Sequence, residues 1–184
     1  ALLQADARAA KLDEKLAEAK KRYFSLAQRL TALREAAAER LSGDVLSQLR
    51  ALGMEKAAFR VAFAAPQDNG EPQENGMDAL EFLLSANPGE PLKPLAKVAS
   101  GGELSRIMLG FKAIFADNDR IGTLIFDEID TGISGRIAGT VGEKMVGIAG
   151  AHQVICVTHL PQIAALADVH YLVEKTDDGM ATHV

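Results

Sequence analysis

The sequence predicts an α/β fold, with a mixed or parallel sheet and flanking helices, preceded by a long coiled-coil helix. Three observations support this fold class. An apolar heptad pattern fills the first part of the chain. Short, continuous apolar runs alternate with segments of helical spacing from residue 103 onward. Glycines, prolines and polar residues gather between these segments. We therefore divide the chain into an arm, residues 1–42, and a head lobe, residues 43–184.

The arm is predicted from apolar residues that are spaced alternately three and four positions apart. They are Leu2, Ala5, Ala9, Leu12, Leu16, Ala19, Tyr23, Leu26, Leu30, Leu33 and Ala37. Neither glycine nor proline interrupts them before Gly43, and the apolar spacing continues toward Gly53, where we expect the helix to end. The alternative is an amphipathic helix packed on a globular core. The first residues have no helix-capping side chain, so we expect the chain to be part of a longer protein. The helix that pairs with this arm is expected to be an earlier helix of the same protein or a helix of another molecule.

The head lobe is expected to begin with two strands joined by a polar hairpin loop. A proline-rich stretch without regular structure follows, and then helices and buried strands alternate. We expect strands at 58–65, 78–85, 123–126 and 154–158, helices at 103–115 and 136–149, a proline-rich loop at 87–97, and two edge strands around an Asp-Gly turn within 169–184. The runs at 123–126 and 154–158 are continuous enough to predict strands covered on both faces.

The composition limits the classes of protein that fit. The net charge is −5, which does not favour a nucleic-acid partner through bulk electrostatics. Residues 1–42 nevertheless carry nine Lys or Arg against six Asp or Glu, whereas the rest of the chain carries 11 against 19. The single cysteine excludes an internal disulfide and fits a reducing cytoplasm. No apolar run is long enough for a membrane span.

Two carboxylates follow directly on the apolar strand at 123–126. Asp127 and Glu128 stand where open α/β sheets bind ligands, at the carboxyl end of a strand. One can hold a hydrated Mg²⁺ and the other can orient a water molecule. The alternative is a helix N-terminus at which acidic residues are favoured by the dipole. A carboxylate-metal nuclease that adds Asp130 is a further alternative, but it lacks additional acidic ligands at other strand ends.

A histidine ends the next apolar strand. His159 precedes Pro161, which can start a helix, and at the end of a neighbouring strand it can reach the same crevice as the carboxylates. The alternative is a histidine that merely caps a strand–helix junction. The remaining histidines (His152, His170 and His183) are predicted to be surface residues. No His or Cys spacing suggests zinc, and Cys156 is predicted to be a core residue.

A glycine pair opens the helix that precedes these strands. Ser100, Gly101 and Gly102 stand immediately before Glu103, where glycines let the backbone approach an anion and unpaired helix N–H groups point toward it. The alternative is a serine that caps the helix, with glycines nearby. Local spacing does not decide between the two.

The order of these motifs resembles the C-terminal lobe of ATP-binding-cassette (ABC) ATPase heads. SGGE matches the signature loop, TLIFDE the Walker B strand, the following turn the D-loop, and TH the strand with the switch histidine. The longer stretches NPGEPLKPLAKVASGGELSRIMLGFK, FDEIDTGISG and THLPQIAALAD are most similar to the SMC-like branch of this superfamily, which includes DNA repair ATPases. The motifs span residues 87–168, and Ile129 stands where transporter cassettes usually have proline.

The resemblance implies the following roles. ATP and Mg²⁺ are bound between two heads: Asp127 holds Mg²⁺ through water, Glu128 activates the attacking water, and His159 contacts the γ-phosphate. Ser100, Gly101, Gly102 and Glu103 bind the γ-phosphate held by the opposite head. Ser134 falls at the place of the usual D-loop aspartate, so Asp130 is assigned part of that role.

The resemblance also implies partners and a cellular role. The phosphate loop G-x-x-x-x-G-K-[ST] does not occur in the chain, so it must come from an N-terminal Walker A lobe of the same protein. We therefore expect this chain alone to be inactive, and the whole protein to be an ATPase in DNA double-strand-break repair. Its heads form a homodimer, it tethers DNA, and it is cytoplasmic and nucleoid-associated without a membrane partner. A non-enzymatic coiled-coil scaffold and a transporter-type nucleotide-binding subunit remain as alternatives.

Overall fold

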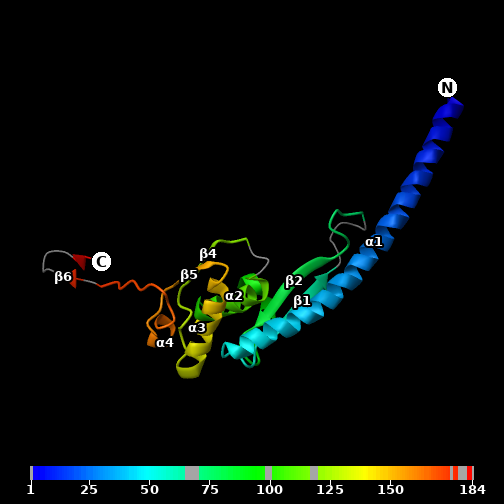
Figure 1. The fold of residues 1–184 in the computed structure, drawn as a ribbon. Helices are drawn as coiled ribbons and strands as arrows, with labels where there is room; N and C mark the ends of the chain where they lie inside the picture. Colours follow the sequence, from blue (N-terminus) through cyan, green and yellow to red (C-terminus); the bar gives the residue numbers. More distant parts are fainter. Residues whose placement is uncertain are drawn as a thin grey trace. The chain divides into compact units, whose positions relative to one another are not determined.

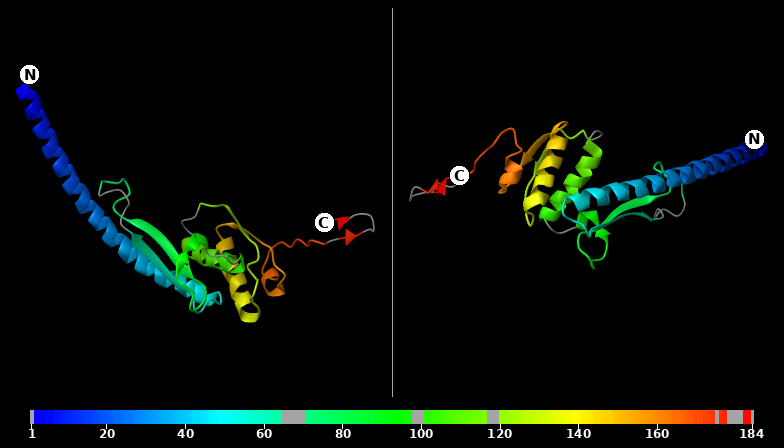
Figure 2. Two further views of the ribbon diagram at one scale, coloured as in Figure 1. Left: turned by 180° about the vertical axis from the view of Figure 1, so that it is seen from behind. Right: turned by 60° about the horizontal axis from the view of Figure 1, so that its bottom comes forward.

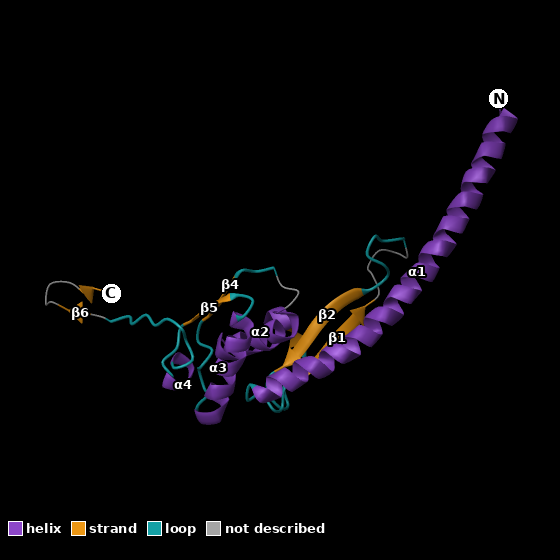
Figure 3. Ribbon diagram, viewed as in Figure 1, coloured by secondary structure: helices purple, strands orange, loops and turns teal. Residues whose placement is uncertain are grey.

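The computed structural model describes residues 2–64, 71–97, 101–116, 120–174, 176–177 and 182–183 (Figure 1). In chain order its elements are α1 (Leu2–Ala51), β1 (Ala58–Ala64), β2 (Ala79–Ser85), β3 (Lys93–Pro94), a 3-10 helix (Leu95–Lys97), α2 (Gly101–Phe115), β4 (Thr123–Phe126), α3 (Gly135–Ala149), β5 (Gln153–Cys156), α4 (Pro161–Ala164), β6 (Thr176–Asp177) and β7 (Thr182–His183). Figure 3 shows them by type. The chain forms two compact units, Ala1–Ser47 with Lys56–Val98, and Gln48–Glu55 with Ala99–Val184. The hairpin strands thus group with most of α1. The division into an arm, residues 1–42, and a head lobe, residues 43–184, stays a prediction.

The first unit joins most of α1 to an antiparallel sheet in the order β1-β2-β3. β1 and β2 pair along their whole length, from Ala58 opposite Ser85 to Ala64 opposite Ala79. The short strand β3 was not expected in the proline-rich stretch. It fits because Pro94 lies on an edge strand opposite Leu83, where a missing backbone N–H costs little.

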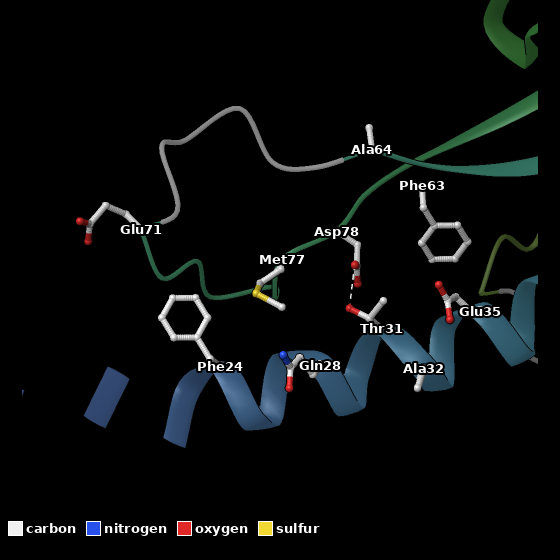
Figure 4. Close-up of a pocket in the computed structure, with 10 residues that line it drawn as sticks. All are labelled: Phe24, Gln28, Thr31, Ala32, Glu35, Phe63, Ala64, Glu71, Met77 and Asp78. Atoms are coloured by element: carbon white, nitrogen blue, oxygen red, sulfur yellow. Dashed lines mark hydrogen bonds between the residues drawn. The ribbon is translucent and has the colours of Figure 1, made fainter. Parts of the chain in front are cut away.

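One face of α1 contacts the hairpin. Thr31 Oγ1 donates to Asp78 Oδ1 at 2.7 Å, and Arg34 Nη1 donates to Asp78 Oδ2 at 3.1 Å. Figure 4 shows the groove of about 570 Å³ beside these residues, with Phe24 and Met77 among those that line it. These polar contacts fix the hairpin to one side of α1.

The heptad seam of α1 lies largely outside that contact. Leu12, Leu16, Leu26 and Leu33 are all exposed, each by more than half of its surface. Ala27, which is not in the predicted seam, is buried instead. A row of exposed leucines on a long helix is what a coiled-coil arm presents to a second helix.

The second unit is built on the parallel pair β4-β5. Its core, against which Val154 and Cys156 of β5 pack, combines residues of β4, α2, α3 and α4 with one residue after β4 and one directly after α1. They are Leu52, Leu109, Leu124, Phe126, Ile129, Ala138, Val141, Met145, Ile148 and Ile163. Figure 2 shows α2 and α3 side by side in this unit. α1 ends at Ala51, as expected, because Gly53 adopts a φ of +83° and Met54 N donates back to Leu49 O at 2.9 Å.

Only one face of the β4-β5 pair is covered within this unit, which corrects the expectation of strands buried on both faces. Leu124 and Phe126 point into the core, whereas Ile125 is 69%, Ile155 45% and Val157 59% exposed. At the end of the chain, β6 and β7 pair antiparallel with Thr176 opposite His183, and the Asp-Gly turn expected between them lies outside the described residues. Residues 170–174 form no strand, and β6 and β7 comprise only two residues each.

Candidate functional site

The predicted carboxylates and histidine leave the sheet at the same edge. β4 and β5 run parallel with Phe126 opposite Cys156, and Val157 N donates to Phe126 O at 2.9 Å. The carboxyl ends of the two strands are therefore adjacent, and residues 127–128 and 158–159 follow them directly. This is the position at which α/β proteins commonly bind ligands.

Glu128 is held in a tight turn. It has a φ of +56°, the only positive φ at a non-glycine position among the described residues. Its amide donates to Asp127 Oδ1 at 2.9 Å, and Thr131 N donates to its carbonyl oxygen at 3.1 Å. The left-handed conformation costs a side-chain-bearing residue about 1–2 kcal/mol, so the surrounding contacts must hold it. Both carboxylates are exposed, and the turn fixes the direction of Glu128.

Asp130 joins this turn to the end of β5. Its side chain is only 4% exposed, and Oδ2 accepts hydrogen bonds from Thr158 Oγ1 at 2.5 Å and from His159 N at 2.9 Å. His159 Nδ1 lies 3.1 Å from the same oxygen. Burial alone would raise the pKa of Asp130, but these hydrogen bonds and the charge of His159 lower the pKa below its ordinary value. Asp130 therefore positions His159 within its own chain.

The glycines at the start of α2 lie against the Glu128 turn of the same chain. A Cβ on Gly101 would collide with Oε2 of Glu128. A Cβ on Gly102 would lie 2.8 Å from the carbonyl oxygen of Glu128 and 2.9 Å from Cβ of Thr131. Only glycine permits this approach, which gives Gly102 a packing role in addition to any contact with an anion. Ser100 lies outside the described residues.

Two further residues of α2 bind the same turn, and our reading of the sequence missed both. Ser105 Oγ donates to Asp127 O at 2.8 Å, and Arg106 Nη1 donates to Ile129 O at 3.3 Å and to Thr131 O at 2.8 Å. The sequence carried a signal for Arg106, because this arginine shares the apolar face of α2 with Gly102, four residues earlier, and with Leu109 and Gly110 after it.

The remaining candidate residues lie near the carboxyl ends of β4 and β5, and none has an unusual backbone conformation. Glu103 lies in the first turn of α2, half-buried, and its charge acts on Arg106. Ser134 is the exposed N-cap residue of α3, without a side-chain capping hydrogen bond. Cys156 is partly buried as predicted, and burial, together with the charges of Asp130 and Asp127, raises its pKa to about 11. Its thiol is therefore not suited to nucleophilic chemistry.

The prediction that His152 lies at the surface is wrong. Its side chain is only 7% exposed, and its Nδ1 lies 2.6 Å from Ile121 O while Nε2 lies 3.3 Å from Ala116 O. The ring joins the end of α2 to the segment before β4, with each ring nitrogen facing a backbone carbonyl. His170 is exposed, as expected, and the side chain of His183 lies outside the described residues.

Known proteins resemble the chain in both sequence and fold, although no family model matches it. It is 51% identical over 151 residues to DNA repair protein RecN of Halalkalibacterium halodurans, an alignment that covers 82% of this chain and 27% of that protein. It is 44% identical over 169 residues to DNA repair protein RecN of Bacillus subtilis, covering 85% of this chain and 29% of that protein. The chain thus spans less than a third of the length of these relatives.

A solved structure supports the fold. The Smc head domain with a coiled coil and joint derived from Pyrococcus yayanosii matches 89% of this chain and 28% of its own, with a TM-score of 0.50 and 19% sequence identity. Together with the long helix and the parallel pair of strands, this match defines the class by its fold: part of a head domain of the SMC kind, with a long helix that leads into it. Within that class, the chain belongs to the RecN family of DNA repair proteins.

The carboxylate of Asp127 fits a metal ion whose other ligands come mainly from a nucleotide. Among the described residues no group of three or more His, Cys, Asp or Glu side chains could hold a metal ion. Asp127 is exposed, and only its Oδ1 is used by the amide of Glu128, which leaves Oδ2 for a water molecule of a hydrated Mg²⁺. Mg²⁺ commonly binds in this way, through one or two carboxylates together with substrate phosphates.

Proposed function

We propose that this chain is the C-terminal half of an SMC-like ATPase head, together with the helix that returns from its coiled coil. The observation that carries the proposal is the shared edge at which Asp127 and Glu128 follow β4 and His159 follows β5. The RecN relatives, which are named DNA repair proteins, support a role of the whole protein in DNA repair, and we propose that it acts on double-strand breaks. ATP binding engages two heads, hydrolysis separates them, and the arms carry that change to bound DNA.

The residues of this edge divide the work of ATP hydrolysis. Asp127 holds the water shell of Mg²⁺, and the metal neutralises phosphate charge when it is bound with ATP. Glu128 orients the attacking water and accepts its proton. His159 uses Nε2 for a γ-phosphate oxygen, since Nδ1 faces Asp130. Phosphoryl transfer needs positioning more than covalent chemistry, which fits the tightly held turn at Glu128.

The signature residues serve a second nucleotide. Ser100, Gly101, Gly102 and Glu103 bind the γ-phosphate that the opposite head holds, and the N-terminus of α2 supplies N–H groups for it. Asp130 contributes from the D-loop by fixing His159. ATP therefore joins two protomers, and the protein acts as a homodimer. We place it in the cytoplasm, at the nucleoid, and within the described residues no helix is long and apolar enough to cross a membrane.

The bare face of the β4-β5 pair is the surface that receives the Walker A lobe of the same protein. Ile125, Ile155 and Val157 form a row of exposed apolar side chains on neighbouring strands. Rows of this kind mark interaction surfaces. The phosphate loop is absent from this chain, so a lobe that covers this face supplies it.

Ile125→Glu in the complete protein is expected to weaken ATP binding at least about tenfold, because a buried carboxylate without a partner opposes docking of the lobe. The measurement is the affinity for a fluorescent ATP analogue. Val146→Glu is the matched control, since Val146 is also exposed and apolar but lies on α3. Equal ATP affinity in Ile125→Glu and the wild type would exclude this face as the docking surface.

The proposal as a whole predicts a difference between this chain and the complete protein. The complete protein is expected to hydrolyse ATP and to bind DNA with an affinity that falls as salt rises. This chain, produced alone and checked for folding by circular dichroism, is expected to show no ATP turnover. Absence of ATP hydrolysis by the complete protein would refute the enzymatic role and favour a scaffold.

A further inference from the structure

α2 carries a buried arginine that the proposed mechanism does not use. The side chain of Arg106 is only 7% exposed, and Nη1 donates to the carbonyl oxygens of Ile129 and Thr131. Its Nε is buried without a hydrogen-bond partner among the described residues. Burial lowers the pKa of the guanidinium, and the charge of Glu103 opposes that effect. Burying a guanidinium cation against neutral carbonyls costs free energy. A role in packing alone is therefore a poor explanation for Arg106.

The loop that Arg106 holds is the turn that directs Glu128. Thr131 supplies both a carbonyl to Arg106 and an amide to the carbonyl oxygen of Glu128, at 3.1 Å. Ile129, the second acceptor, directly follows Glu128 in the chain. Arg106 therefore binds two carbonyl oxygens of the residues that follow Glu128, in the turn that keeps Glu128 at a φ of +56°.

The other contacts of α2 reach the same turn. Ser105 Oγ donates to Asp127 O at 2.8 Å, and Gly102 lies so close that a Cβ would be 2.8 Å from the carbonyl oxygen of Glu128. Gly102, Ser105 and Arg106 lie within little more than one turn of one helix. A helix turn is stiff, so a displacement of the α2 N-terminus must move the carbonyls of the Glu128 turn with it.

We propose that Arg106 is a positioning residue that transmits the position of the α2 N-terminus to Glu128. This inference rests on the proposed function, in which the α2 N-terminus of one head contacts the γ-phosphate at one nucleotide site and Glu128 serves the other. Arg106 then links the two sites through a single chain. Binding at the first site sets the orientation of the glutamate at the second.

The test uses Arg106→Met in the complete protein, since methionine fills space without donating hydrogen bonds. The expected result is a kcat for ATP that falls about 10- to 100-fold, because the glutamate is misplaced, with KM and ATP-dependent dimerisation changed by no more than about threefold. The Hill coefficient for ATP falls toward 1 at the same time. Arg106→Lys, which keeps the charge and N–H donors, is expected to recover kcat to within about fivefold of the wild type.

The controls separate this inference from a structural role. Arg50→Met removes an exposed arginine of the same unit and should leave kcat, KM and the Hill coefficient unchanged. A parallel loss of kcat, KM, dimerisation and melting temperature in both Arg106 variants would overturn the inference, since that pattern reports a damaged fold. If Arg106→Met does not fold, Arg106→Gln decides, because glutamine is too short to reach both carbonyls: a lowered kcat and Hill coefficient with a normal melting temperature supports the inference, and wild-type kinetics overturn it.

Failure of the inference and failure of the proposed function give different results. Wild-type kinetics in a folded Arg106→Met protein overturn the role of Arg106, while loss of hydrolysis in Glu128→Gln still supports the proposed ATPase. No ATP turnover by the wild-type protein overturns both.

Discussion

Glu128→Gln in the complete protein is expected to lower the rate of ATP hydrolysis by about 10²- to 10⁴-fold, the usual contribution of a general base. Glutamine keeps the shape of the side chain and the turn around it, but it cannot accept the proton of the attacking water. ATP binding should persist, because neither the metal contact of Asp127 nor the phosphate contact of His159 is removed. The variant should therefore accumulate as an ATP-bound dimer.

The measurements are single-turnover hydrolysis and size-exclusion chromatography with ATP. Glu143→Gln is the matched control, since Glu143 is an exposed glutamate on α3 in the same unit. Its rate and its dimer fraction should equal those of the wild type. Hydrolysis by Glu128→Gln at the wild-type rate would mean that another group is the base.

The turn at Glu128 also shows what the sequence could and could not predict. The FDE motif placed two carboxylates at the end of β4, and the order of the motifs placed His159 at the end of the neighbouring strand. Those positions follow from hydrophobic runs and from the rule that parallel strands share an edge. The positive φ of Glu128 could not be read from the residue type, because glutamate is not favoured there.

The links between segments were the other part that sequence patterns missed. Asp130 was assigned to a nucleotide contact, yet its carboxylate is buried against Thr158 and His159, 28 and 29 residues later in the chain. Arg106 was passed over as one polar residue of a helix, and His152 as a surface histidine. Tertiary packing decides such contacts, and periodicity reports only which face of an element is apolar.

The strands β3, β4 and β5 differ from the sequence prediction for a similar reason. β3 forms within a stretch of three prolines because one of them, Pro94, can occupy an edge strand. The strands β4 and β5 were expected to be covered on both faces, since their apolar runs are continuous. Among the described residues of this unit nothing covers the second face, and in the proposed function the Walker A lobe packs on its exposed apolar residues.

Asp130→Ala is expected to have the second large effect, which is a loss of local stability at the residues that follow β5. The substitution leaves Thr158 Oγ1 and the amide of His159 without their acceptor, and it removes the partner of His159 Nδ1. Leaving these partly buried donors without an acceptor costs about 2–4 kcal/mol of local stability. Hydrogen exchange at the amide of His159 should therefore be about 30- to 1,000-fold faster in the complete protein. Asp168→Ala, an exposed aspartate in the same unit, should leave this amide unchanged.

The pH dependence of the free energy of unfolding, compared between wild type and Asp130→Asn, tests independently whether the charge of Asp130 stabilises the fold. The folded pKa of Asp130 is lowered from 3.8, so its charge stabilises the fold above that pH, and the benefit is lost as the pH falls through the lowered pKa. Asparagine keeps an acceptor but has no charge to lose. The difference in the free energy of unfolding between wild type and Asp130→Asn should be largest near pH 7 and should decrease below about pH 4. A gap that stays constant from pH 7 to pH 2.5 would show that the charge of Asp130 does not hold His159. The position of His159 would then rest on the backbone at the end of β5 alone.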